Sequence, residues 1–212
     1  MGRFGSVKGQ APGNKDRTFP AEVLTTDEIA GVIGRCSPRA PTGIRNRAML
    51  MLLYRSGLRV SELLALKPSD VNVTACTVRV LHGKGNKATT RGFHPSATDS
   101  LARWIDTRRA LGIRSGPLFC TLSGGPVHAQ YVRLLLHRLA ASAGLDKRVH
   151  PHALRHTFAW ELEQSGIPVS VISDLLGHSS IAVTARYLKH LTNNQAVSVL
   201  RSAELPPLKD VR

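Results

Sequence analysis

The segment His152–His156 (HALRH) decides how the rest of this sequence is interpreted. Its first histidine and its arginine stand three residues apart, so a helix would bring both side chains to one face. Two further signals follow it: Leu176-Gly177-His178, where a helix is expected to end, and then Tyr187. Short consecutive helices would therefore supply three groups that bind phosphate and one hydroxyl nucleophile. This arrangement favours covalent chemistry on a phosphodiester.

The overall charge of the chain agrees with such a substrate. Among 212 residues, 29 are Lys or Arg and 14 are Asp or Glu, which gives a net charge of +15. A charge of this sign and size indicates a polyanionic partner, most often nucleic acid, although a ribosomal-type protein or a membrane-surface binder would also fit. The basic residues are spread through segments that are expected to fold, which favours a folded DNA-binding surface.

Composition also bounds the class of protein. Apolar residues make up 42% of the chain, enough for one full hydrophobic core at this length. The cysteines, Cys36, Cys76 and Cys120, lack the spacing of metal ligands and are expected to be reduced, mostly buried thiols. No apolar run is long enough for a bilayer, and the N-terminus lacks a signal region, so we expect a cytoplasmic, nucleoid-associated protein without a membrane partner.

Hydrophobic periodicity predicts a mostly helical α+β fold with one small antiparallel sheet. A capping box of Thr25 and Glu28 opens the first helix. The predicted strands are 77–82 and 88–93, joined by a turn at 83–86, with a further short strand at 117–121. The other predicted helices cover 45–55, 59–66, 96–111, 128–143, 151–165, 168–176, 181–190 and 194–203.

The same pattern predicts how the chain is divided. Residues 1–20 are rich in Gly, Lys and Arg and are expected to form a flexible basic arm or a leader without a role. Residues 21–203 carry all the predicted elements and form one domain, and residues 204–212 form a short tail after a Pro-Pro pair.

Arginine is the best side chain for neutralising a phosphodiester, because its planar fork bonds two oxygens at once. Besides Arg155, the candidate is Arg59, which follows a helix break at Gly57. Glu62 lies three residues on, on the same helix face, and could orient the Arg59 guanidinium. The alternative is an exposed ion pair worth ~0.2–0.5 kcal/mol.

Other candidate groups have a functional and a structural interpretation. Lys84 lies between two glycines in the predicted hairpin turn, where it could protonate a leaving alkoxide, or it could be a solvated lysine that touches phosphate, as we expect for Lys87. His178 could bind phosphate or satisfy the carbonyls of a helix end. Tyr187 follows Arg186 on a polar helix, so its hydroxyl is expected to be exposed and available as a nucleophile.

A zinc site is the alternative interpretation of the local cluster of His150, His152 and His156. Zinc hydrolases with this histidine spacing place a glutamate directly after the first histidine, and here that residue is Ala153. No cysteine or carboxylate nearby completes a ligand set. The sequence therefore predicts no metal site.

Taken together, these residues resemble the tyrosine recombinase, or phage integrase, family. The resemblance runs from about Thr25 to His190 and is carried by five stretches in the family's order and spacing. These are SGLRVSEL (56–63), GKGNK (83–87), HALRHTFA (152–159), LLGHSS (175–180) and TARY (184–187). The fold that it implies is the family's DNA breaking-rejoining catalytic domain, over residues 21–203.

The resemblance implies a role for each matching residue. Tyr187 would attack the scissile phosphate and form a 3′-phosphotyrosyl link, and Arg59 and Arg155 would clamp the non-bridging oxygens. His152 would assist proton transfer, His178 would bond the phosphate, Lys84 would protonate the leaving 5′-oxygen, and Glu62 would support Arg59. Lys87 and Arg91 are expected to contact DNA. No metal, ATP or organic cofactor is implied.

The resemblance also implies partners and assembly. Double-stranded DNA would be bound by a homotetramer, with a monomer as the free state, and the helix at 194–203 would dock on a neighbouring subunit or pack on its own domain. The family's separate helical core-binding domain is expected to be absent, because about twenty residues are too few for it. The alternatives to a site-specific recombinase are a DNA-relaxing enzyme of the type IB topoisomerase kind and a non-catalytic DNA-binding protein with the same fold.

Overall fold

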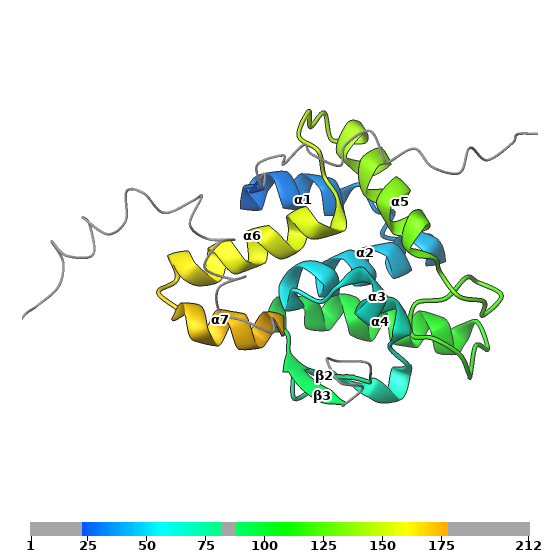
Figure 1. Cartoon of the computed structure of the whole chain (residues 1–212). Coiled ribbons are helices and arrows are strands. Elements are labelled where there is room, and N and C mark those ends of the chain that lie inside the picture. The colour runs from blue at the N-terminus through cyan, green and yellow to red at the C-terminus, as the bar shows by residue number, and fades with distance from the viewer. Residues whose placement is uncertain (1–22, 82–87, 178–212) are drawn as a thin grey trace, which may run out of the picture.

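The protein is described by a computed structural model that covers residues 23–81 and 88–177 (Figure 1). The helices of this part are α1 (Thr26–Gly34), α2 (Pro41–Ser56), α3 (Val60–Ala65), α4 (Thr98–Ala110), α5 (Ala129–Ser142), α6 (Pro151–Gln164) and α7 (Val169–Leu176). The strands are β1 (Val71–Asn72), β2 (Thr77–Val80) and β3 (Thr89–Gly92), and 3-10 turns cover Pro68–Asp70 and Pro95–Ala97. The predicted α+β, mostly helical fold is confirmed.

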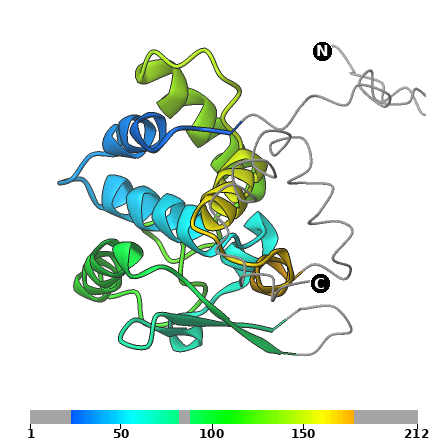
Figure 2. The same cartoon turned by 90° about the vertical axis from the view of Figure 1, so that its left-hand side faces the viewer.

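Helix α2 lies at the centre of the molecule, because it is apolar on several faces at once. Ala48, Met49, Leu50, Leu52 and Leu53 are all fully buried. A helix that is hydrophobic around most of its circumference must be surrounded by other elements. Accordingly, α2 packs against α1, α3, α4 and α6, and Figure 2 shows it between α1 and α4.

Within the described residues, the sheet has the antiparallel order β1-β2-β3. The hairpin of β2 and β3 pairs Val78 with Arg91 and Val80 with Thr89. Directly opposite residues in an antiparallel pair present their side chains to the same face. Arg91, opposite the buried Val78, also faces the interior, and it is the buried residue of β3.

Several element boundaries follow the predictions. The capping box is present, since Thr25 accepts from the Glu28 N–H and the Glu28 carboxylate accepts from the Thr25 N–H. Gly57 ends α2 in the left-handed conformation, with φ +61°. Helix α2 begins at Pro41, four residues before the predicted start, because the proline occupies a position where the missing N–H costs nothing.

Two strand predictions differ from the structure. The short strand β1 was not predicted, because two residues are too few to show an alternating pattern, and it pairs with β2 through Val71 and Asn72. The strand predicted at 117–121 is wrong, apart from an isolated bridge between Cys120 and Pro126. In this segment the N–H of Leu118 donates to Leu66 and that of Thr121 to Gly125, so its backbone groups are satisfied outside a ladder.

The predicted turn at 83–86 and the predicted helices 181–190 and 194–203 lie outside the described residues. Cys36 and Cys120 are buried free thiols, and Cys76 is a half-buried one. In residues 23–81 and 88–177, no helix has both the length and the apolar character that crossing a membrane requires.

Candidate functional site

Gly57 brings α2, α6 and α7 into close contact and so creates the setting of the site. A Cβ atom at this position would lie 2.6 Å from Leu176 Cδ2 and 2.9 Å from Phe158 Cδ1. Only a glycine permits both this approach and the positive φ. The break after α2 therefore places the start of α3, with Arg59, next to α6 and the end of α7.

Arg59 and Glu62 form the ion pair that the sequence predicts. The Arg59 guanidinium donates to Glu62 Oε1 over 2.9 Å, and the Arg59 backbone N–H donates to Oε2 over 2.8 Å. The Glu62 side chain is 8% exposed and that of Arg59 is 45% exposed. A buried carboxylate thus holds a guanidinium whose other edge remains open to solvent.

Arg155 lies deeper than Arg59, with 1% of its surface exposed. Its guanidinium donates to the carbonyl oxygen of Gly57 and, over 2.8 Å, to that of Leu176. Both acceptors are neutral carbonyls at helix ends, which carry the negative end of the helix dipole. These carbonyls fix the position of Arg155. Unlike a carboxylate, they carry no net charge that would offset the charge of the guanidinium.

Arg91 also belongs to this cluster. Its guanidinium donates to both carboxylate oxygens of Glu62, over 3.3 and 3.4 Å, and to the Leu176 carbonyl over 3.1 Å. The sequence predicts a DNA contact for Arg91, whereas the structure places it in the interior with 8% exposed surface. The register of the β2–β3 hairpin explains this burial, because it sets Arg91 opposite the buried Val78.

His152 lies in the first turn of α6, near both candidate clamp arginines. Burial lowers its pKa, and the positive charges of Arg155 and Arg59 lower it further. The ring of His156 lies one turn on, with its centroid 5.6 Å from that of His152. His152 is therefore held in its neutral form at neutral pH, in which it can accept a proton.

His150, the third histidine of the predicted cluster, has a structural role. It caps α6, and its Nδ1 accepts from the backbone N–H of Ala153. Across the described segments, no group of three or more His, Cys, Asp or Glu side chains is arranged to hold a metal ion.

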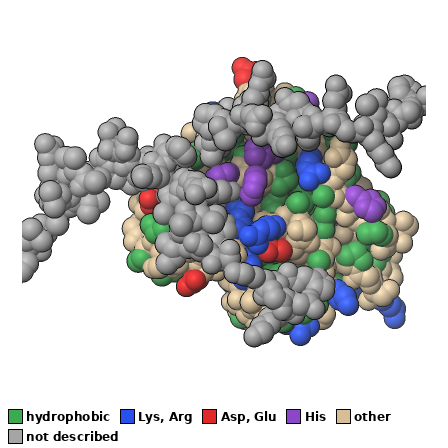
Figure 3. Space-filling model, viewed as in Figure 1, with side chains coloured by type: hydrophobic (Ala, Val, Ile, Leu, Met, Phe, Trp, Pro, Cys, Tyr) green, Lys and Arg blue, Asp and Glu red, His purple; other side chains and the backbone are tan. Residues whose placement is uncertain are grey.

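Figure 3 shows one face of the molecule on which histidine and basic side chains gather beside an acidic one. Four of the predicted site residues, Lys84, Lys87, His178 and Tyr187, lie outside the described part of the chain. In sequence, Lys84 and Lys87 belong to the connection between β2 and β3, and His178 directly follows Gly177, the C-cap of α7. The described residues thus bring together Arg59, Glu62, Arg91, His152 and Arg155.

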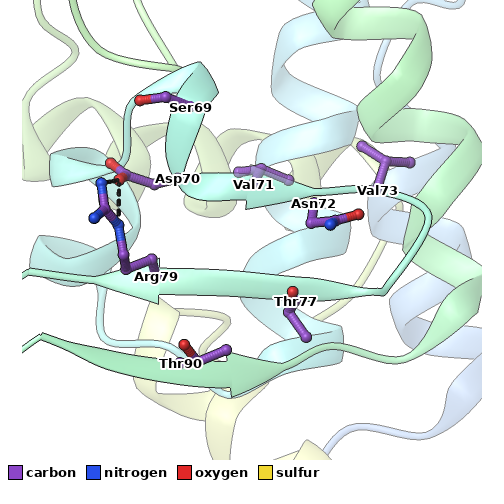
Figure 4. Close-up of a pocket in the computed structure, with 8 residues that line it drawn as sticks. All are labelled: Ser69, Asp70, Val71, Asn72, Val73, Thr77, Arg79 and Thr90. Atoms are coloured by element: carbon purple, nitrogen blue, oxygen red, sulfur yellow. Dashed lines mark hydrogen bonds and ion pairs between the residues drawn. The ribbon is translucent and has the colours of Figure 1, made fainter.

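A shallow hollow on the outer part of the sheet lies apart from this cluster (Figure 4). Its charged groups are Asp70 and Arg79, which pair over 3.0 Å. Its other lining residues are small polar or apolar side chains of β1, β2 and β3 and of the turns on either side of β1. With one matched ion pair, it offers no excess charge for a phosphate.

Apart from Arg91, the residues that meet in the cluster come from the stretches that carry the resemblance, and comparison with known proteins agrees with this resemblance. The model of the phage integrase family matches residues 22–194. The chain belongs to the phage integrase family. The described fold and the order of the motifs are those of one family domain.

The relatives are tyrosine recombinases. Tyrosine recombinase XerC of Halalkalibacterium halodurans is 35% identical over 186 residues, which cover 84% of this chain and 61% of the relative. Tyrosine recombinase XerD of Ralstonia nicotianae is 39% identical over 169 residues, covering 78% of this chain and 55% of the relative. The chain thus spans little more than half the length of these relatives.

Solved structures of the family have the same fold. The crystal structure of XerA recombinase matches with a TM-score of 0.75 and 28% identity, covering 94% of this chain and 70% of that one. The XerH site-specific recombinase, bound to its palindromic difH substrate after cleavage, matches with a TM-score of 0.71 and 25% identity, covering 92% of this chain and 56% of that one.

Proposed function

We propose that this chain is the catalytic domain of a site-specific DNA recombinase or integrase, which cleaves and rejoins DNA through a 3′-phosphotyrosyl intermediate. The observation that carries the proposal is the convergence of Arg59, Arg155 and His152 from α3 and α6 beside one buried carboxylate. It is supported by the net charge of +15 and by the recombinases among the relatives.

The two arginines would bind the scissile phosphate. Arg59 is held by Glu62 with part of its side chain open to solvent, and Arg155 donates to two backbone carbonyls that hold it in place. The attraction between the arginines and the phosphate is strongest where water is excluded, because solvent screening is weak there. Donors that are fixed before the reaction lower the barrier without reorganising, as charge develops on the phosphoryl oxygens.

The reaction exchanges one phosphodiester for another. The Tyr187 oxygen attacks phosphorus and gives its proton to His152, while the bond from phosphorus to the 5′-oxygen breaks and Lys84 protonates that oxygen. His178 donates a hydrogen bond to the phosphoryl group. Because one P–O bond forms as another breaks, the reverse attack by a 5′-hydroxyl rejoins DNA without an external energy source.

The partner would be double-stranded DNA in the nucleoid. Residues 21–203 would bind it, and Lys87 would contact a backbone phosphate. Exchange between two duplexes needs four cleavage events, so the proposed working form is a homotetramer on DNA. Size measurement of the chain with and without its DNA site tests this assembly, since a complex that stays at one chain per duplex contradicts it.

The chemistry is tested by covalent capture. The wild-type chain is mixed with a pool of randomised duplexes that carry single nicks at varied positions, so that a short 5′-hydroxyl fragment diffuses away after cleavage. The proposal expects adducts that resist denaturing gels, with DNA attached through its 3′-phosphate to Tyr187. Sequencing of the trapped DNA then gives the site.

Two tyrosine variants separate the nucleophile from its alternatives. Tyr187→Phe should form no adduct, whereas Tyr131→Phe should still form it, because the Tyr131 hydroxyl is engaged with Arg45 and Asn46. If the Tyr187→Phe variant still forms the adduct, Tyr187 is not the nucleophile. Relaxation of supercoiled plasmid without the captured site would instead favour a topoisomerase.

A further inference from the structure

Arg91 connects three elements that are distant in the sequence. It lies on β3, its carboxylate partner Glu62 lies on α3, and its carbonyl partner Leu176 ends α7. Both side chains of the Arg91–Glu62 pair are 8% exposed. A guanidinium is suited to this position, since its five N–H donors lie in one rigid plane and can serve several acceptors.

Glu62 and the Leu176 carbonyl are each shared between two arginines. Glu62 accepts from Arg59 and Arg91, and the Leu176 oxygen accepts from Arg91 and Arg155. Arg91 is thus the one described residue that bonds both an acceptor of Arg59 and an acceptor of Arg155. Movement of its guanidinium would displace the support of both.

Gly177 shows that this contact is tightly fitted. A Cβ atom at residue 177 would overlap Arg91 Nη2 and lie 2.6 Å from Arg91 Cζ. Gly177 also has φ +61°, which a residue with a side chain adopts only with strain. The missing side chain therefore leaves the space into which the Arg91 guanidinium fits.

We propose that Arg91 is a positioning residue, which fixes the Glu62 carboxylate and the end of α7 relative to each other and so sets the places of Arg59 and Arg155. This inference rests on the proposed function for its catalytic consequence. It replaces a DNA contact as the role of Arg91, because the Glu62 carboxylate bonds both terminal nitrogens of the buried Arg91 guanidinium and offsets the charge that a backbone phosphate would need.

The kinetic test separates binding from cleavage. On the captured nicked duplex, Arg91→Gln should lower the single-turnover rate of adduct formation at saturating DNA by up to about 10²-fold, the effect expected of misplaced reacting groups. The Kd for the same duplex should stay at the wild-type value. The rate for Arg91→Lys should lie between those of the wild type and Arg91→Gln, because an ammonium keeps the charge but cannot bond all three acceptor oxygens.

Arg79→Gln is the matched control. Arg79 lies on the neighbouring strand β2 and also pairs with a carboxylate, that of Asp70, but its side chain is 56% exposed and lies away from the cluster. This variant should cleave at the wild-type rate. Equal losses in Arg79→Gln and Arg91→Gln would overturn the proposal.

Two other results would overturn it as well. If Arg91 contacts DNA, Arg91→Gln should weaken the Kd, reduce its salt dependence by about 0.9 in log–log slope and leave saturated cleavage unchanged. If Arg91 only stabilises the fold, the variant should melt earlier and cleave at the wild-type rate at temperatures where it is folded.

A double-mutant cycle tests the geometry independently of catalysis. Gly177→Ala introduces backbone strain and a collision with Arg91, and only the collision disappears in an Arg91→Ala background. Gly177→Ala should therefore destabilise the Arg91→Ala variant less than it destabilises the wild type. Additive effects on urea unfolding would contradict the fit. If the wild-type chain forms no adduct, the proposed function fails, while this cycle still decides whether Arg91 positions the end of α7.

Discussion

Arg59–Glu62 and Arg109–Asp106 are two ion pairs of the same i,i+3 spacing that differ in burial. The Glu62 side chain is 8% exposed and faces a second guanidinium, whereas both side chains of the other pair are more than two-thirds exposed, at 76% and 70%. Removing one partner of a buried pair leaves an uncompensated charge, and removing one partner of an exposed pair does not.

We therefore predict that Glu62→Gln lowers the free energy of unfolding by about 3 kcal/mol. Asp106→Asn, its matched control, should change it by less than about 0.5 kcal/mol. Urea denaturation of the two variants measures both values. Equal effects would mean that burial does not govern the Glu62 pair.

His152 should make stability depend on pH. Burial and the charges of Arg155 and Arg59 lower its pKa in the folded protein, so the unfolded chain binds the proton more tightly. The resulting stabilisation is present above the ordinary histidine pKa of about 6.5 and is lost as the pH falls toward the lowered folded value.

His152→Gln should therefore flatten the decline of the unfolding free energy below about pH 6.5, relative to the wild type. Urea denaturation over a pH series gives the two slopes. Parallel curves for the two proteins would show that His152 does not contribute to this pH dependence.

Lys84 is predicted to act as the general acid, whose loss costs ~10²–10⁴-fold in rate. Lys84→Ala should lose this factor on ordinary DNA and regain most of it on a substrate with sulfur in place of the bridging 5′-oxygen, because a thiolate leaves without a proton. Single-turnover cleavage of the two substrates compares them. If Lys84→Ala is equally slow on both substrates, Lys84 does not act as the general acid.

At the scale of elements, Gly57 combines the contact of α2, α6 and α7 with a positive φ. Gly57→Ala should cost about 1–2 kcal/mol for the left-handed backbone and a further ~1–3 kcal/mol for the collision with Leu176 and Phe158. Gly112 isolates the first contribution, since it has φ +73° and no atom within 4 Å of the added Cβ. Thermal or urea unfolding that gives equal losses for Gly57→Ala and Gly112→Ala would contradict the close approach.

The helices and the hairpin could be predicted from the sequence because their signals are local. The capping box at Thr25, the break at Gly57 and the alternation of Val78 and Val80 each act over a few residues. The strand predicted at 117–121 failed because its apolar residues are buried by other elements, without a ladder. β1 is too short to produce a pattern of its own.

The candidate site was predictable as a set of residue types but not as a geometry. Arg59, Glu62, His152 and Arg155 were recognisable from their spacing and from the family resemblance. The role of Arg91 depends on Glu62 and Leu176, which lie 29 and 85 residues away in the chain. No local pattern encodes such contacts, and the register that sets Arg91 opposite the buried Val78 became known only from the structure.

At the scale of the whole molecule, the excess of basic residues should dominate binding to DNA. The affinity for a duplex of random sequence should fall steeply with salt, with a log–log slope of about −0.9 for each phosphate neutralised. Fluorescence anisotropy across a salt series measures this slope. A slope near zero would contradict an electrostatic DNA interface.

The contact at Gly57 has a practical consequence for protein engineering. The space that a residue 57 side chain would need is already occupied by Leu176 and Phe158, so the three positions share one volume. Libraries that vary residue 57 alone should return almost nothing but glycine. Libraries that randomise 158 and 176 together, with glycine retained at 57, should return compensating pairs in which one side chain grows as the other shrinks.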